Sequence, residues 1–128
     1  MTGQKGSNPY KTGFWYLASP YSKHPKGIFA AHHEACRAAA LCFDAGIFVY
    51  APIPHTHNIA DLMGCAINFD HWKDFSLLMV ERAEGVIVVK LASWERSIGV
   101  QAEIAYAREL GKPVLFMEPD GPVPELPI

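Results

Sequence analysis

The sequence has 128 residues and a formal net charge of −2, with 50% of its residues hydrophobic and 19% charged. This length suits one domain with its own core, and the charge lacks the basic surplus typical of proteins that bind duplex DNA or anionic membranes. We therefore expect a single domain over residues 1–128, with no nucleic acid polymer and no membrane among its partners. No apolar run approaches the ~18 residues of a membrane span and no early segment resembles a signal peptide, so the expected location is the cytoplasm.

Apolar runs that read as strands alternate along the chain with segments that read as helices. Residues 1–12 are polar and glycine-rich and are expected to form a loose lead-in. Strands are predicted over residues 13–19, 47–51, 85–90 and 113–117. Helices are predicted over residues 28–45, 70–83 and 97–110. Residues 52–58, with two prolines, are predicted to be a loop, and a short helix is expected to begin near Asn58. The proline-rich tail, residues 118–128, is expected to lie on the surface or on a neighbouring subunit.

This alternation predicts a parallel sheet covered by helices on both faces. Helical spacing predicts the inward side chains of the first long helix as Phe29, His33, Cys36, Ala40 and Phe43, and the helix is expected to end at Gly46. In the helix over residues 70–83, the predicted inward side chains are Trp72, Phe75, Leu78 and Met79. The three cysteines, Cys36, Cys42 and Cys65, lack metal-ligand or disulfide spacing, and the first two are expected to be reduced core thiols.

Ligands of parallel α/β sheets bind at the carboxyl ends of the strands, which here brings together residues 19–26, 52–58 and 91–99. The last of these loops leads into a helix that opens on Ser97 and Gly99, and helix starts offer unpaired N–H groups to anions. Glu103 lies one turn further on the same face. We therefore predict that Glu103 is a nucleophile for a sugar carbon, that Tyr16 orients it, and that Ser97 and Gly99 help to form the substrate pocket.

Each of these residues also has a purely structural interpretation. Glu103 would then be a solvated helix residue, Tyr16 a core residue and Ser97 an N-cap. Asp70 and Asp74 either complement a helix dipole or supply a second carboxylate for general acid–base work.

The aromatic and histidine side chains at the predicted rim also leave alternatives open. His55 and His57 either line the pocket or, with His32 or His33, hold a metal ion, and we favour the pocket wall. Trp94 and Tyr21 either stack on a planar base or are packing residues.

Three segments together resemble the nucleoside 2-deoxyribosyltransferase-like superfamily, in particular its small DUF1937-type proteins. They are WYLASPYS at residues 15–22, PIPHTHN at residues 52–58, and GVIVVKLASWERSIGVQAEIAYARELGKPV at residues 85–114. The SIGVQAE motif at residues 97–103 is similar to the S-L-G-V-x-x-E of the deoxynucleoside 5′-monophosphate N-glycosidases.

The resemblance implies a flavodoxin-like or Rossmann-like α/β fold, with a parallel sheet of four to five strands and helices on both faces. It also implies a retaining double displacement at C1′ of a nucleoside or nucleotide. Glu103 matches the family nucleophile and Tyr16 the tyrosine that positions it, while Ser97 and Gly99 match residues that contact a 5′-phosphate. The position of the usual aspartate of the family holds Ser76, with Asp74 nearby as a substitute.

We therefore expect an N-glycosidase acting on a nucleoside or nucleoside 5′-monophosphate, or a deoxyribosyltransferase, without cofactor or metal and as a homo-oligomer. Tyr16, Asp74 and Glu103 are the expected catalytic residues. The expected substrate-binding residues are Ser19, Tyr21, His55, His57, Ser76, Trp94, Ser97 and Gly99. The alternatives are a non-catalytic nucleotide-binding module, a metal-dependent hydrolase using His55 and His57, and an interaction protein with a relict pocket.

Overall fold

The computed structural model describes residues 13–21, 24–64 and 69–127. The elements in chain order are β1 (Trp15–Ala18), α1 (Ile28–Asp44), β2 (Val49–Tyr50), α2 (Pro52–Met63), α3 (Phe69–Arg82), β3 (Val86–Val89), the 3-10 turn η1 (Trp94–Arg96), α4 (Ile98–Glu109) and β4 (Val114–Met117). The predicted lead-in, residues 1–12, and Cys65 lie outside the described residues.

The strands form a parallel sheet in the order β2-β1-β3-β4, which confirms the predicted α/β fold. β1 and β3 are neighbours at the centre, and the chain winds outward from them in opposite directions, to β2 and to β4. The carboxyl ends of β1 and β3 therefore flank the switch point at which such sheets bind ligands.

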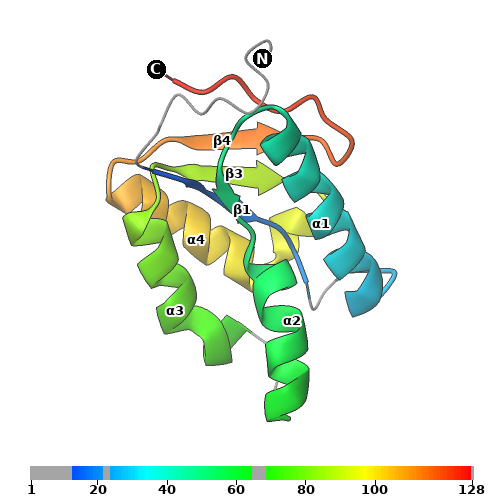
Figure 1. The fold of residues 1–128 in the computed structure, drawn as a ribbon. Coiled ribbons are helices and arrows are strands. Elements are labelled where there is room, and N and C mark those ends of the chain that lie inside the picture. The colour runs from blue at the N-terminus through cyan, green and yellow to red at the C-terminus, as the bar shows by residue number, and fades with distance from the viewer. Residues whose placement is uncertain (1–12, 22–23, 65–68, 128) are drawn as a thin grey trace.

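Helices cover both faces of the sheet, with α1 on one face and α3 and α4 on the other (Figure 1). The first core cluster, which we call the α1-face core, comprises Trp15, Leu17, Ala38, Cys42, Ile47, Ile87, Val89, Leu91 and Met117. The second cluster, the α4-face core, comprises Tyr16, Ala18, Val80, Ala83, Val86, Val88, Val100, Ile104 and Ala107. Alternate residues of β1 and β3 thus enter opposite cores, as the pleat of a strand requires.

The inward face of α1 differs from the prediction. Its buried residues are Ala31, Ala35, Ala38 and Cys42, whereas Phe29 is 75% exposed and Phe43 is 51% exposed. The predicted set followed the largest side chains, but small side chains let the helix approach the sheet closely. Cys42 is a buried free thiol, as predicted, and Gly46 ends the helix region with a positive φ of 84°.

Residues 52–58 are helical, so the prediction of a loop there was wrong. α2 begins directly at Pro52 and ends at Met63. Its C-cap is Gly64, which adopts the left-handed conformation with φ 64° and ψ 28°. Pro52 and Pro54 both lie in the first turn, where a residue has no N–H partner inside the helix and proline is tolerated. The prolines therefore mark the start of a helix and not its absence.

The inward face of α3 agrees with the prediction only in part, since Met79 packs against the α4-face core and Trp72 is partly buried. Ser76, Val80 and Ala83 are buried, whereas Phe75 is 37% exposed and Leu78 is 45% exposed. The carboxyl end of this helix is held by Lys112, whose ammonium donates to the carbonyl oxygens of Val80 at 3.4 Å and Ala83 at 2.6 Å, and also to that of Glu81. A cation at this position interacts favourably with the last carbonyls of the helix and with the negative end of its dipole.

The proline-rich tail packs on its own domain. Val123 and Leu126 contact the α1-face core, and Asp120 forms a 2.7 Å ion pair with Arg37 of α1. The tail thus covers part of the sheet next to α1 without forming a helix. Among the described residues, none of the helices is long and apolar enough to cross a membrane.

Candidate active site

The centre of the candidate site is a hydrogen bond between two buried side chains from different elements. The hydroxyl of Tyr16 donates to Oε2 of Glu103 over 2.7 Å. Tyr16 lies on β1 and is 0% exposed, and Glu103 lies on α4 and is 5% exposed. The structure thus brings together the two residues that the sequence predicted to form a pair. It also excludes the interpretation of Glu103 as a solvated helix residue.

Burial dominates the electrostatics of this pair. Desolvation raises the pKa of Glu103 to about 8, and the hydrogen bond from Tyr16 lowers it by a smaller amount. The pKa of Tyr16 is raised well above its usual value by burial first, and then by the charge of Glu103 and the hydrogen bond to it. Tyr16 therefore stays protonated as a donor, while Glu103 changes its charge close to physiological pH.

Ser76 on α3 is the third member of this cluster. It is 6% exposed, and a hydrogen bond from its side chain lowers the pKa of Tyr16, in opposition to the burial of the phenol. Three elements, β1, α3 and α4, therefore converge on the phenol oxygen. Asp74 lies on α3 two residues before Ser76 and is exposed, and its predicted catalytic role stays a prediction.

Ser97 caps the helix that carries Glu103. Its Oγ accepts a hydrogen bond from the backbone N–H of Val100 over 3.2 Å, which confirms the N-cap interpretation. Gly99 is partly buried in the first turn of α4, one turn before Glu103. The predicted contacts of Ser97 and Gly99 with a substrate stay predictions, and they are compatible with the cap because the Ser97 hydroxyl proton remains available.

The predicted rim residues separate into distinct groups. Tyr21 contacts Nδ1 of His57 through its hydroxyl, and the His57 ring stacks on His32 with ring centroids 4.3 Å apart. Trp94 instead pairs with Phe116 of β4, with ring centroids 5.5 Å apart. These rings form a group between α1 and α2 and another beside β4.

His55 and His57 face different neighbours. His55 contacts the rings of Tyr50 and Phe75, at centroid distances of 5.6 and 6.0 Å, whereas His57 lies against His32. In the described part of the chain, no three His, Cys, Asp or Glu side chains are grouped so that they could hold a metal ion. Ser19, which follows β1, is partly buried.

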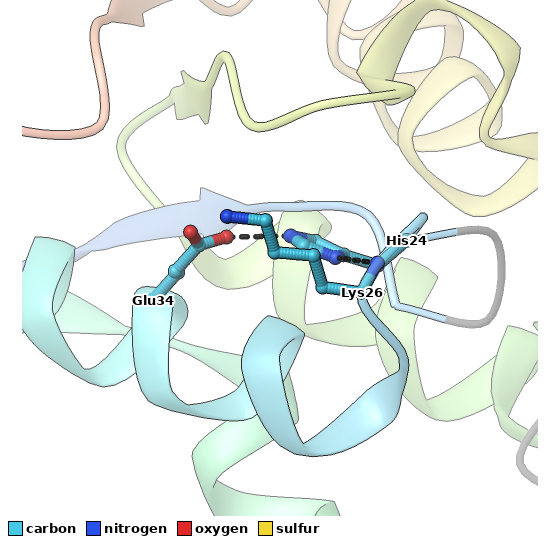
Figure 2. A network of polar contacts seen from close by, with 3 residues as sticks. All are labelled: His24, Lys26 and Glu34. Carbon is cyan, nitrogen blue, oxygen red and sulfur yellow. Dashed lines mark hydrogen bonds and ion pairs between the residues drawn. The ribbon is translucent and has the colours of Figure 1, made fainter.

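A network that the sequence did not reveal fixes the loop between β1 and α1 (Figure 2). The backbone N–H of Lys26 donates to Nδ1 of His24 over 3.1 Å, so the proton of the neutral ring is on Nε2. Nε2 lies 2.5 Å from Oε1 of Glu34, and the His24 side chain is 2% exposed. Both ring nitrogens are thus satisfied, and the network joins residues 24–26 to Glu34 on α1.

Tyr50 is a residue of the site that sequence reasoning missed. It is the register partner of Tyr16 on the neighbouring strand, and the two rings lie 5.9 Å apart. Burial, followed by the charge of Glu103, raises its pKa to about 12. The available signal was strand parity, because register partners on adjacent parallel strands share a face of the sheet.

The comparisons with known proteins agree with part of this picture. The family model described as "Domain of unknown function (DUF1937)" matches residues 13–119, which include every element of the sheet and the whole Tyr16–Glu103 pair. The chain belongs to the DUF1937 family. A search of curated proteins found no match to the chain. The DUF1937 part of the predicted resemblance is therefore confirmed.

Proposed function

We propose that this DUF1937 protein is an N-glycosidase of the nucleoside 2-deoxyribosyltransferase-like type, which cleaves the base–sugar bond of a nucleoside or nucleoside 5′-monophosphate. The related transfer of the sugar to a second base uses the same chemistry. The observation that carries the proposal is the buried hydrogen bond from Tyr16 to Glu103, over 2.7 Å. A desolvated carboxylate that is oriented by a hydrogen-bond donor is suited to nucleophilic attack on a sugar carbon.

The proposed reaction has two displacements. In the first, the ionised Glu103 forms a bond to C1′ while the C1′–N bond breaks, and the base leaves with the bonding electrons and takes a proton from solvent. In the second, a water oxygen bonds to C1′, the ester electrons return to Glu103, and the water loses a proton to solvent. In the transferase version, a nitrogen of a second base replaces the water.

The pKa of Glu103 sets the pH dependence of this reaction. Because burial raises that pKa to about 8, only a minor fraction of the carboxyl is ionised at pH 7. The rate of the first displacement should therefore rise with pH up to about 8 and then level. Tyr16 supports the ionised form because its hydrogen bond lowers the Glu103 pKa.

The test is release of free base from a panel of nucleosides, 2′-deoxynucleosides and their 5′-monophosphates, compared between wild type and Glu103→Gln. Loss of the nucleophile should reduce release by at least about 10³-fold. Glu109→Gln is the matched control, because Glu109 is an exposed glutamate on the same helix. Unchanged release by Glu103→Gln would contradict the proposal, and so would the absence of release from every member of the panel.

A non-catalytic nucleotide-binding module is the second candidate. The observation in its favour is the same raised pKa, since a neutral Glu103 at pH 7 is a hydrogen-bond donor for a bound ligand. Such a module would bind a nucleotide, leave it intact, and keep its affinity in Glu103→Gln.

The proposal includes the cytoplasmic homo-oligomer expected from the sequence. In support of assembly, α2 presents apolar side chains to solvent, with Leu62 86% exposed and Met63 59% exposed. Exposed apolar side chains grouped on one element are typical of interaction surfaces. Sedimentation of wild type beside Leu62→Glu tests this part separately from the activity.

A further inference from the structure

The hydroxyl of Tyr50 is a buried polar group at the carboxyl end of β2. Among the described residues, its oxygen has no hydrogen-bond partner and no exposed surface to bring it water. A buried polar group without a partner costs free energy, and such groups in native proteins call for an explanation. Tyr50 is at the end of β2, on the face of the sheet that carries Tyr16.

The position of this hydroxyl relates it to the candidate nucleophile. Tyr50 is the register partner of Tyr16, which donates to Glu103, and the two phenol rings lie 5.9 Å apart. In accord with this proximity, the charge of Glu103 contributes to the raised pKa of Tyr50. Yet the hydrogen bond that Glu103 accepts comes from Tyr16, and Tyr50 donates none. A separation beyond hydrogen-bond distance between two polar groups is commonly bridged by one oxygen atom. Because its pKa is about 12, Tyr50 is protonated at neutral pH and offers a donor to that oxygen.

Aromatic side chains connect the Tyr50 hydroxyl with the surface. The Tyr50 ring meets His55 edge-on at 5.6 Å and Phe75 edge-on at 6.2 Å. His55 is exposed on α2, and Phe75 is 37% exposed on α3. The His55 and Phe75 rings also contact each other, with centroids 6.0 Å apart, so a flat, largely apolar molecule that displaces them would reach Tyr50. Rings of this kind are typical of sites that bind planar bases.

We propose that Tyr50 is a substrate-binding residue whose hydroxyl donates a hydrogen bond to the 2′- or 3′-hydroxyl of the sugar held against Glu103. This inference rests on the proposed function, since it assigns the sugar to the space between Tyr50 and Glu103. The ligand oxygen supplies the partner that the phenol lacks in the free protein. Tyr50 therefore discriminates between sugars that carry the contacted hydroxyl and sugars that do not.

The experiment removes the Tyr50 hydroxyl from the protein and, separately, the 2′- and 3′-hydroxyls from the sugar. Wild type and Tyr50→Phe are compared on a ribonucleoside, the 2′-deoxynucleoside and the 2′,3′-dideoxynucleoside of the same base. For substrates with the contacted hydroxyl, Tyr50→Phe should lower kcat/KM by about 10-fold, which corresponds to one hydrogen bond. For the analogue without that hydroxyl, the two proteins should not differ. An equal loss on all three sugars, or no loss on any, would overturn the proposal.

Two further measurements separate this proposal from its alternatives. Thermal unfolding of Tyr50→Phe should be unchanged or slightly higher than that of wild type, because the lost hydroxyl had no partner, and a clear decrease would indicate a structural role instead. Calorimetric binding of the same three nucleosides to Glu103→Gln, with and without Tyr50→Phe, needs no turnover. If wild type releases no base but the hydroxyl-dependent difference in affinity is present in Glu103→Gln and lost on adding Tyr50→Phe, the proposed reaction fails and the assignment of Tyr50 stands. If affinity is insensitive to the sugar hydroxyls in both proteins, the assignment fails.

Discussion

The two faces of the sheet are buried by side chains of different chemistry. Beneath α1 and the C-terminal tail, the α1-face core is entirely hydrophobic. Beneath α3 and α4, the α4-face core adjoins a phenol, a hydroxyl and a carboxyl group, from Tyr16, Ser76 and Glu103. Hydrophobic burial stabilises a fold, whereas a buried carboxyl group costs free energy in its ionised form. Apolar burial therefore stabilises both faces, whereas the proposed chemistry uses only the face under α3 and α4.

The largest effect on stability is expected from the α1-face core. Leu17→Ala removes a large part of a side chain that is 1% exposed and leaves a cavity, so it should lower the free energy of unfolding by about 2–5 kcal/mol. The folded fraction should keep the kcat/KM of wild type. Leu78→Ala is the matched control, because Leu78 is 45% exposed, and it should lower the free energy of unfolding by less than about 1 kcal/mol. A loss of kcat/KM in the folded Leu17→Ala protein would contradict the view that the α1-face core takes no part in the chemistry.

In contrast to Leu17→Ala, Glu103→Gln is expected to raise the free energy of unfolding at pH 8. The pKa of Glu103 is about 8 in the folded protein against a usual value of 4.5, so the folded state binds more protons than the unfolded state between these values. Stability should therefore fall as the pH rises from about 4.5 to about 8 and then stay level. Glutamine removes this loss, and the variant should exceed wild type by a few kcal/mol (order of magnitude) at pH 8 and equal it at pH 4. Denaturant unfolding at both pH values, beside Glu109→Gln, measures the difference, and a wild type that is equally stable at both would refute it.

Tyr16→Phe tests whether the phenol tunes the carboxyl group. Its hydrogen bond lowers the Glu103 pKa, so its removal should raise that pKa and move the pH–rate profile to higher pH, by about one to two units. Activity at pH 7 should fall by roughly 10- to 100-fold and recover in part at high pH. Tyr106→Phe is the control. Tyr106 lies on α4 like Glu103 and donates an exposed hydrogen bond to Glu81 of α3, so its loss should leave the pH–rate profile unchanged. A loss of activity that is equal at every pH would show that Tyr16 acts in another way.

The smallest effect is expected from the tail. Val123 is a partly buried residue against the α1-face core, and Val123→Ser should lower the free energy of unfolding by about 1 kcal/mol without changing activity. Glu125→Ala is the exposed control in the same segment. If the two variants are equally stable, the tail does not contribute to the core, and the α1 face depends on α1 alone.

The sheet could be predicted from the sequence because its strands are short apolar runs separated by turn signals. The buried face of each helix could not be predicted from the sequence, since it depends on how closely the helix approaches the sheet. In α1 the contact is made by Ala31, Ala35 and Ala38, which carry a weak hydrophobic signal, while Phe29 is exposed. The start of α2 was missed because Pro52 has the same composition signal in a loop and in a first helical turn.

The candidate site divides in a similar way. Glu103 and Tyr16 were predictable as a pair because the motif placed one on a helix start and the other on the first strand. Tyr50 was not found, since its importance depends on the register of β2 against β1, which no local pattern specifies. The contact of Ser76 with Tyr16 depends likewise on the rotation of α3, which turns Ser76 inward and leaves Phe75 partly exposed.

The contacts of Lys112 with the end of α3 protect its amine from chemical labelling, so labelling can report when that end of the helix opens. All three N–H donors of this ammonium reach backbone carbonyls, so an amine reagent must wait until the contacts open. Lys26 and Lys73 are exposed and should be acetylated early in a time course, with Lys112 late. The acetylation rate of Lys112 therefore measures how often the carboxyl end of α3, the helix that carries Ser76, opens. A ligand that stabilises the site should lower this rate.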